Sequence, residues 1–176
     1  MEKVGFDQLE LNPFTVIGDE AFLLTSGGED SWNTMAAAWG GFGFLWPSPT
    51  VYVFVRDSRY TCSFMENSGR FSLSFFSPGR HEVIDYCGEH SGRDTDKVRD
   101  TGLTPFMIDG AVSFEEANLI ITCEKTAGAL IDRECIASPD LIEKFYKDGD
   151  SHHMYAGRVI GIYAVSYTHL TLPTKP

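Results

Sequence analysis

The chain has 176 residues, a length that suits one domain with its own buried core. Its 14 Lys and Arg residues face 25 Asp and Glu residues, so the formal net charge is −11. Nucleic acids and anionic membrane surfaces are polyanions, and a chain this acidic is expected to bind neither. A bound phosphate would need a locally positive pocket.

The first eleven residues contain no basic stretch followed by an apolar core, and the apolar runs along the chain are too short to cross a bilayer. We therefore expect a cytoplasmic protein with no membrane association. Cys62, Cys87, Cys123 and Cys135 are widely spaced and form no CxxC pair. They are expected to be reduced thiols, and the sequence predicts no metal centre.

The first half of the chain predicts short strands interrupted by short helices. Two-residue alternation and β-branched runs mark the strands, while Asn, Pro and Gly mark the helix ends and turns. In order, we expect a helix from Pro13 to just before Gly18, a strand at 21–25 and a turn at 26–30. A strand at 34–39 should continue through a glycine-kinked bend at 40–45, followed by an extended turn at 46–49. A strand at 50–55, a helix at 59–67 and a strand at 70–76 complete this half.

The second half continues the same mixture of short elements. The expected elements are a helix at 81–87, a charged exposed helix or ordered loop at 89–101, a strand pair at 112–115 and 119–125, an amphipathic helix at 141–146 and a strand at 154–165 with kinks at Gly157 and Gly161. This order predicts a mainly β fold, an antiparallel barrel with helical insertions.

Residues 166–176 (SYTHLTLPTKP) break the pattern of the strand before them. Residues 165–174 resemble the conceptual translation of a transposon adapter used in sequencing-library preparation. We therefore expect one domain over residues 1–165, followed by a non-native tail at 166–176. A natural floppy tail is the alternative.

Residues 33–44 (NTMAAAWGGFGF) combine small side chains with hydrogen-bond donors and the large ring of Trp39. Small residues allow backbone amides to approach a flat or phosphorylated ligand, which an aromatic ring can then cover. Residues 52–61 form a run of β-formers that carries Arg56 and Arg59 near its end, where guanidinium groups suit a phosphate. Together the two stretches predict a nucleotide or flavin-phosphate site.

Several ordered motifs make the chain resemble the flavin reductase-like family, the FMN-binding split barrels that include the flavoredoxins. The pattern NTMxxxWGGxG is matched at 33–43, and VRxxRYT is matched at 55–61. The resemblance covers roughly residues 10 to 165. Its further motifs lie at 71–76, 85–88, 91–94, 102–105 and 152–157.

The resemblance implies an antiparallel split β-barrel of Greek-key type that binds one FMN per subunit. It also implies a homodimer with FMN near the subunit interface, and hydride transfer from NAD(P)H to the flavin, followed by electron transfer to a small molecule or a protein. Two alternatives stay open. One is a flavoredoxin-like electron carrier supplied by a protein partner, and the other is a non-catalytic flavin-binding module.

The resemblance also implies roles for individual residues. Arg56 and Arg59 are assigned to the FMN phosphate, against the alternative of surface ion pairs at a strand end. Trp39 either stacks near the ring or plugs the barrel. The other cofactor-binding assignments are Asn33, Thr34, Met35, Ala36, Ala38, Tyr60, Thr61, Ser74 and Phe76.

Three further expectations concern His152, the alanines at 36 and 38, and the charged run at 89–100. His152 falls on the family's late histidine and is the candidate catalytic residue, against the alternative of an ordinary loop histidine. The family often has Thr and Ser where this chain has Ala36 and Ala38, so hydroxyl donors are missing there. The charged run at 89–100 is expected to be a solvated face.

Overall fold

The computed structural model describes residues 1–9 and 11–165 of the chain. The predicted tail at 166–176 lies outside the described residues. The strands are β1 (Glu2–Lys3), β2 (Phe22–Gly28), β3 (Ser31–Ala37), β4 (Gly40–Leu45), β5 (Ser48–Arg56), β6 (Arg70–Phe75), β7 (Pro105–Ile108), β8 (Ala111–Phe114), β9 (Leu119–Ile131) and β10 (His152–Ala164). The α-helices are α1 (Pro13–Gly18), α2 (Tyr60–Asn67), α3 (His81–Glu89), α4 (Lys97–Thr101) and α5 (Pro139–Phe145).

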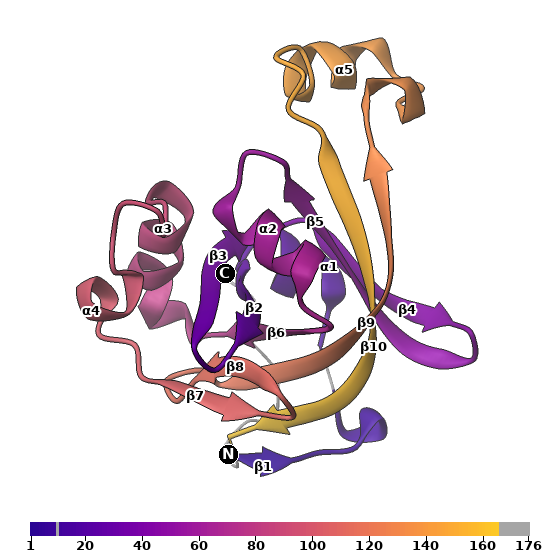
Figure 1. The fold of residues 1–176 in the computed structure, drawn as a ribbon. Coiled ribbons are helices and arrows are strands. Elements are labelled where there is room, and N and C mark those ends of the chain that lie inside the picture. The colour runs from indigo at the N-terminus through magenta and orange to yellow at the C-terminus, as the bar shows by residue number, and fades with distance from the viewer. Residues whose placement is uncertain (10, 166–176) are drawn as a thin grey trace.

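The main sheet has eight strands and is antiparallel throughout. Its order is β3-β2-β6-β9-β10-β5-β4, and β1 pairs with β10 off this path. The sheet curls around a core, while β3 and β4, which follow one another in the chain, form its two edges (Figure 1). This is a split barrel, as the sequence predicted, and the helices are inserted between its strands.

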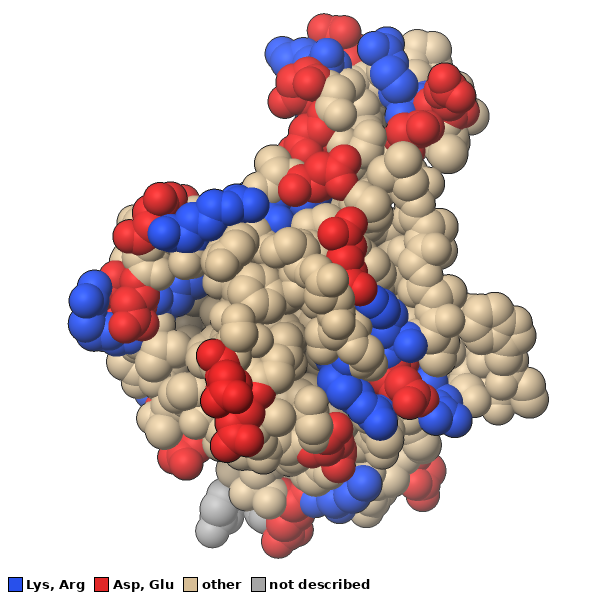
Figure 2. All heavy atoms as spheres, in the orientation of Figure 1, with Lys and Arg blue, Asp and Glu red and all other residues tan. Residues whose placement is uncertain are grey.

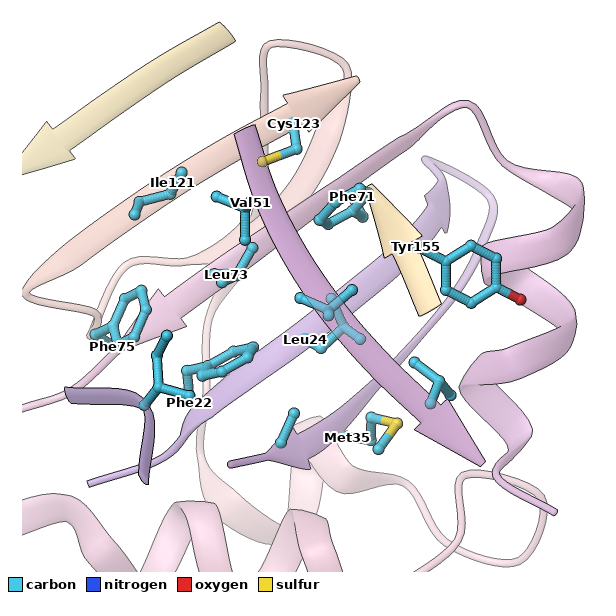
Figure 3. Packing of buried hydrophobic residues seen from close by; sticks show 14 of the residues in the cluster. Phe22, Leu24, Met35, Val51, Phe71, Leu73, Phe75, Ile121, Cys123 and Tyr155 are labelled. Atoms are coloured by element: carbon cyan, nitrogen blue, oxygen red, sulfur yellow. The ribbon is translucent and has the colours of Figure 1, made fainter. Parts of the chain in front are cut away.

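Two hydrophobic clusters hold the strands in place, one on each face of the sheet. Phe22, Leu24, Phe71 and Leu73 alternate with residues of the opposite face and fill the barrel interior (Figure 3). Leu23, on the other face of β2, packs with Ile84 of α3 and Phe114 of β8. Because both faces of the central strands are covered, β2 and β6 are buried almost throughout.

β9 and β10 are longer than the barrel and continue out of it as a two-stranded arm (Figure 1). β9 is buried from Leu119 to Cys123 and largely exposed from there on. The arm carries α5 near its tip, and α5 has no buried residue. The barrel is therefore the packed body, and the arm projects from it.

Most predicted elements are present, but three were wrong in detail. β2 continues to Gly28, so the turn predicted at 26–30 is confined to residues 29–30, because Ser26 and Gly27 pair with Asn33 and Trp32. The chain leaves β3 after Ala37, and β4 starts anew at the opposite edge beside β5. Residues 48–49, predicted in an extended turn, begin β5 at that edge.

The predicted pairing of 112–115 with 119–125 was also wrong. β8 pairs with β7, a strand the sequence did not predict, and β9 pairs with β6 and β10. The kinks predicted at Gly157 and Gly161 are confirmed as shifts in the register between β9 and β10. A Cβ at Gly157 would collide with the ring of Phe71, so this bend needs glycine. Within the described residues, no helix is long and apolar enough to span a membrane.

Candidate functional site

Two adjoining hollows form a cleft where the arm meets the barrel. The larger has a volume of about 540 Å³ and the smaller about 260 Å³. Met35, Arg56, Arg59 and Phe145 line both, so the hollows are continuous. Ligand sites in proteins have volumes of this order, roughly 300–1,000 Å³.

The larger hollow is positively charged in an otherwise acidic chain. Six of the 14 Lys and Arg residues line it, against four of the 25 Asp and Glu residues. Arg59, Arg93 and Lys97 form no ion pair with a carboxylate within the described residues. Their charges are available to an anion. The cationic residues of the lining are Arg56, Arg59, Arg93, Lys97, Lys144 and Lys147.

Lys97 is the most deeply placed of these cations, with 6% of its surface exposed. Its ammonium donates hydrogen bonds of 2.8 Å to the carbonyls of Thr34 and Cys87. Burial lowers the pKa of Lys97, and the positive charge of Arg59 acts in the same direction. An ammonium has three donors, so one remains for a group in the hollow. An anion there would offset the cost of burying this charge.

Arg56 is held at the end of β5 by Asp150, which comes from the arm. Its Nη1 donates to the Asp150 carbonyl at 3.1 Å and lies 3.5 Å from the carboxylate. Ser58 donates to the same carboxylate through its backbone N–H and its hydroxyl, at 3.1 and 2.8 Å. Burial raises the pKa of Asp150, but the hydrogen bonds from Ser58 and the charge of Arg56 outweigh it and lower the pKa overall. This network ties the arm to the barrel.

The floor of the larger hollow is a close contact between three elements. Asn33 of β3 donates to the hydroxyl of Thr61, at the first turn of α2, over 2.8 Å. A Cβ at Gly92 would collide with Asn33 Oδ1, so glycine is required for the loop before α4 to lie here. Tyr60 lines the hollow beside Arg93, whose guanidinium lies 4.7 Å from the Tyr60 ring centroid. The first turn of α2 thus adds its helix N-terminus to the positive charges.

Apart from Arg56 and Arg59, which it shares with the larger hollow, the smaller hollow is lined by apolar and aromatic residues. Ala36 and Ala38 form its small-residue wall, and Trp39, Phe145 and His152 stand around it. The Trp39 ring lies 4.8 Å from the His152 ring and 5.3 Å from the Phe145 ring, centroid to centroid. Trp39 is 42% exposed. The alternative that Trp39 plugs the barrel is therefore wrong, because the ring lies in the cleft.

His152 is buried at the base of the smaller hollow, beside Trp39 and Tyr146. Burial lowers the pKa of its imidazole below 6.5, and Arg56 acts in the same direction. Its Nδ1 has no hydrogen-bond partner within the described residues. His152 is therefore a neutral imidazole near pH 7. The alternative of an ordinary hydrogen-bonded loop histidine does not fit, because His152 begins β10.

The structure brings most of the predicted site residues together. Those that line the cleft are Asn33, Met35, Ala36, Ala38, Trp39, Arg56, Arg59, Tyr60, Thr61 and His152. Thr34 reaches the cleft only through its backbone, since its hydroxyl accepts a hydrogen bond from Thr25 on the face of the sheet opposite the barrel interior and its carbonyl accepts one from Lys97. Ser74 and Phe76 lie elsewhere. Ser74 is hydrogen-bonded to Ser113, and Phe76 belongs to the cluster around α3.

Sequence reasoning missed the contributions of Arg93, Lys97, Lys144 and Phe145 to the cleft. The run at 89–100 was predicted to be a solvated face, and this was wrong for Lys97, which is buried in the cleft wall. Charge runs are usually solvated, and no periodic signal in the run marks one lysine as buried. The motif at 91–94 was the available signal, since Gly92 and Arg93 both lie at the cleft.

The fold and the cleft define a barrel that can hold an anionic group at one end and a flat apolar group at the other. Comparison with protein-family models matches residues 17–171 to the flavin reductase like domain. The chain therefore belongs to the flavin reductase-like family, and the resemblance drawn from its motifs is confirmed. Among curated proteins, none matches the chain.

Solved structures share this fold at low sequence identity. Flavoredoxin from Methanosarcina acetivorans matches with a TM-score of 0.65 and 23% identity, over 84% of this chain and 69% of its own. Flavoredoxin of Desulfovibrio vulgaris (Miyazaki F) matches with a TM-score of 0.65 and 24% identity, over 83% of this chain and 69% of its own. An NADH:FAD oxidoreductase from Streptomyces globisporus matches with a TM-score of 0.62 and 16% identity, over 83% of this chain and 75% of its own. The chain thus has the split-barrel fold of these proteins.

Proposed function

We propose that the chain binds FMN in this cleft and acts as an NAD(P)H-dependent flavin oxidoreductase. The observation that carries the proposal is the division of the cleft. Its larger hollow gathers six cationic side chains in a chain of net charge −11. Its smaller hollow, apart from the shared Arg56 and Arg59, is lined by apolar and aromatic side chains. FMN has the matching parts, a phosphate and a flat ring system.

The residues present fit the two ends of FMN. Arg59, Arg93 and Lys97 would hold the phosphate, since each has charge to offer and none is neutralised by a carboxylate within the described residues. Asn33 and Thr61 form the polar floor between the two ends. The backbone of β3 from Met35 onward would supply amide groups to the polar edge of the ring, because the alanines there provide no hydroxyl.

Bound FMN supplies the redox chemistry, accepting a hydride from a reduced nicotinamide and releasing electrons to an acceptor. The protein's part is to bind, orient and cover. Trp39 and Phe145 cover the ring end and limit access of water. His152, neutral by burial and by its neighbour Arg56, presents an uncharged imidazole at this end. It is suited to orient the substrate, and it adds no charge to that of Arg56 and Arg59, which also line this hollow.

Anaerobic reduction tests the proposed activity. The protein loaded with FMN is mixed with NADH or NADPH, and the loss of visible absorption is followed over time. Rapid bleaching by either nicotinamide supports the oxidoreductase and shows which donor it prefers. If bound FMN stays oxidised with both donors but is reduced by a protein electron donor, the flavoredoxin-like carrier is correct. If neither donor reduces it, the chain is a flavin-binding module.

We also propose that two copies of the chain associate near the flavin. Between Gly40 and Val55 the chain has no charged residue, and Phe44 and Trp46 at the hairpin are 68% and 63% exposed. Figure 2 shows the β4–β5 hairpin as an uncharged projection. Exposed apolar surface of this kind favours an interface. Sedimentation should give a dimer that Trp46→Glu weakens, and a monomeric parent protein would contradict this. Cytoplasmic location remains a prediction from the sequence.

A further inference from the structure

Three metal-ligating side chains from separate elements converge outside the cleft. Asp57 follows β5, Cys62 lies in α2 and His153 lies in β10. One carboxylate oxygen, the thiol sulfur and one imidazole nitrogen lie within 4.8 Å of one another. We propose that Asp57, Cys62 and His153 form a binding site for a zinc-like divalent cation. No step of the proposed flavin chemistry uses these three residues.

The site is separate from the flavin cleft because of the strand geometry. His153 follows His152 on β10, and consecutive residues of a strand point to opposite faces of the sheet. His152 lines the cleft, whereas the imidazole of His153 is hydrogen-bonded to the carboxylate of Asp57. Asp57 and His153 retain access to solvent, while Cys62 is buried behind them. A cation can therefore enter from the solvent side without passing through the cleft.

The donor set selects the class of metal. One thiolate, one imidazole and one carboxylate suit zinc and related ions, whereas magnesium and calcium prefer oxygen ligands alone. With metal–ligand bonds of about 2.0–2.3 Å, tetrahedral ligand atoms lie roughly 3.3–3.8 Å apart. The three ligand atoms lie within 4.8 Å of one another, and His153 and Asp57, now in direct contact, would have to separate to admit the ion between them. The fourth position is open to water.

The electrostatic surroundings also favour a cation. Burial raises the pKa of the Cys62 thiol, and the negative charges of Glu66, Asp57 and Asp150 raise it further. The nearby Lys125 ammonium is held by the carbonyls of Met65 and Glu66. A bound divalent cation would lower the pKa of the Cys62 thiol and deprotonate it.

Tyr155 supplies an outer partner for the sulfur. Its hydroxyl lies 3.7 Å from Cys62 Sγ, and Figure 3 shows it directed out of the hydrophobic cluster that holds the ring. Burial, first of all, raises the pKa of the Tyr155 phenol well above its usual range, so the O–H remains a donor. A metal-bound thiolate could accept this hydrogen bond, as ligands commonly do from an outer residue.

The test is titration of the full-length protein, freed of metal by a chelator, with Co²⁺ as a spectroscopic probe. Tetrahedral Co²⁺ with a thiolate ligand gives d–d absorption bands at longer wavelengths than oxidised flavin. We expect saturation at one equivalent and displacement of Co²⁺ by Zn²⁺. Cys62→Ser should abolish the bands and lower affinity at least about 100-fold, since even outer partners cost about 10–100-fold. Cys135→Ser and His81→Gln, at a cysteine and a histidine outside the triad, are matched controls that should bind as the parent does.

Asp57→Asn and His153→Gln repeat the test at accessible positions, since Cys62 is buried and its replacement can disturb folding. Both should weaken binding of Co²⁺ while the protein stays folded by circular dichroism. Absence of thiolate bands in the parent protein, or their survival in all three triad variants, would overturn the proposal. The flavin spectrum of the same samples reports separately on the cleft, so either proposal can fail alone.

Discussion

The barrel body and the β9–β10 arm are built on different principles. In the body, both faces of β2 and β6 are covered, and large side chains such as Phe22, Phe71 and Phe114 are fully buried. In the arm, the outer part of β9 is exposed and α5 buries none of its residues. Stability comes from the body, because the apolar surface removed from water lies there.

The cleft lies where these two regions meet and takes residues from both. Asn33, Arg59 and Lys97 come from the body, whereas Phe145 and His152 come from α5 and the first residue of β10. The Arg56–Asp150 ion pair joins the two sides. A ligand between body and arm would therefore contact both, although the buried core lies in the body alone.

The largest expected effect is on the stability of the body. Phe71→Ala removes a fully buried ring and should lower the free energy of unfolding by about 3–5 kcal/mol. Leu141→Ala on the half-exposed face of α5 should change it by no more than about 0.5 kcal/mol. Urea denaturation measures both. Equal losses of unfolding free energy in the two variants would contradict the claim that stability comes from the body.

The next effect concerns the anion end of the cleft. Arg59→Gln removes a cation that has no ion-pair partner among the described residues, and it should weaken FMN binding by about 1.5–3 kcal/mol, roughly tenfold to hundredfold. The loss should shrink at high salt. Arg99→Gln is the matched control, because Arg99 is 72% exposed and paired with Asp100. Fluorescence titration measures the affinity, and an equal loss in the control would refute the assignment.

A pH-dependent effect on stability should arise at His152, where the arm meets the barrel body. The pKa of His152 is lowered in the folded protein, so the unfolded chain binds its proton more readily. Stability should therefore fall as pH drops below about 6.5, at most by about 1.4 kcal/mol per pH unit. His152→Gln should flatten this part of the profile. Urea denaturation between pH 5 and 8 measures it, and an unchanged slope in the variant would exclude His152 as the cause.

The smallest effect concerns the aromatic end. Trp39→Ala should weaken FMN binding by about 0.5–1.5 kcal/mol, the range of an aromatic contact. Phe14→Ala, at an 86% exposed ring on α1, is the control and should bind FMN as the parent does. Isothermal titration calorimetry compares the three proteins. Unchanged binding in Trp39→Ala would show that this ring does not cover the ligand.

Local signals predicted the elements well because their causes are local. Asn12 caps α1 through a hydrogen bond to the Phe14 N–H, as its position before Pro13 suggested. Gly157 and Gly161 mark real register shifts. The pairing of β8 with β7 was missed because strand pairing depends on the whole barrel. Propensity shows that residues 112–115 form a strand, but it does not show which partner they take.

The candidate site was predicted where sequence motifs run along one strand, and missed where the fold joins distant segments. Asn33 to Trp39 and Arg56 to Thr61 are continuous stretches that carry readable patterns. Lys97 reaches Thr34 across 63 residues, and no pattern near Lys97 indicates that its ammonium is buried. The Asp57–Cys62–His153 cluster spans 96 residues, which is why cysteine spacing gave no sign of it.

The most direct test of the account is a titration of the purified protein with FMN, followed by absorption and by flavin fluorescence. We expect one FMN per chain, with an affinity that falls in Arg59→Gln and Trp39→Ala but not in Arg99→Gln or Phe14→Ala. A folded protein that takes up no FMN, or whose binding is indifferent to the two cleft variants, would contradict it.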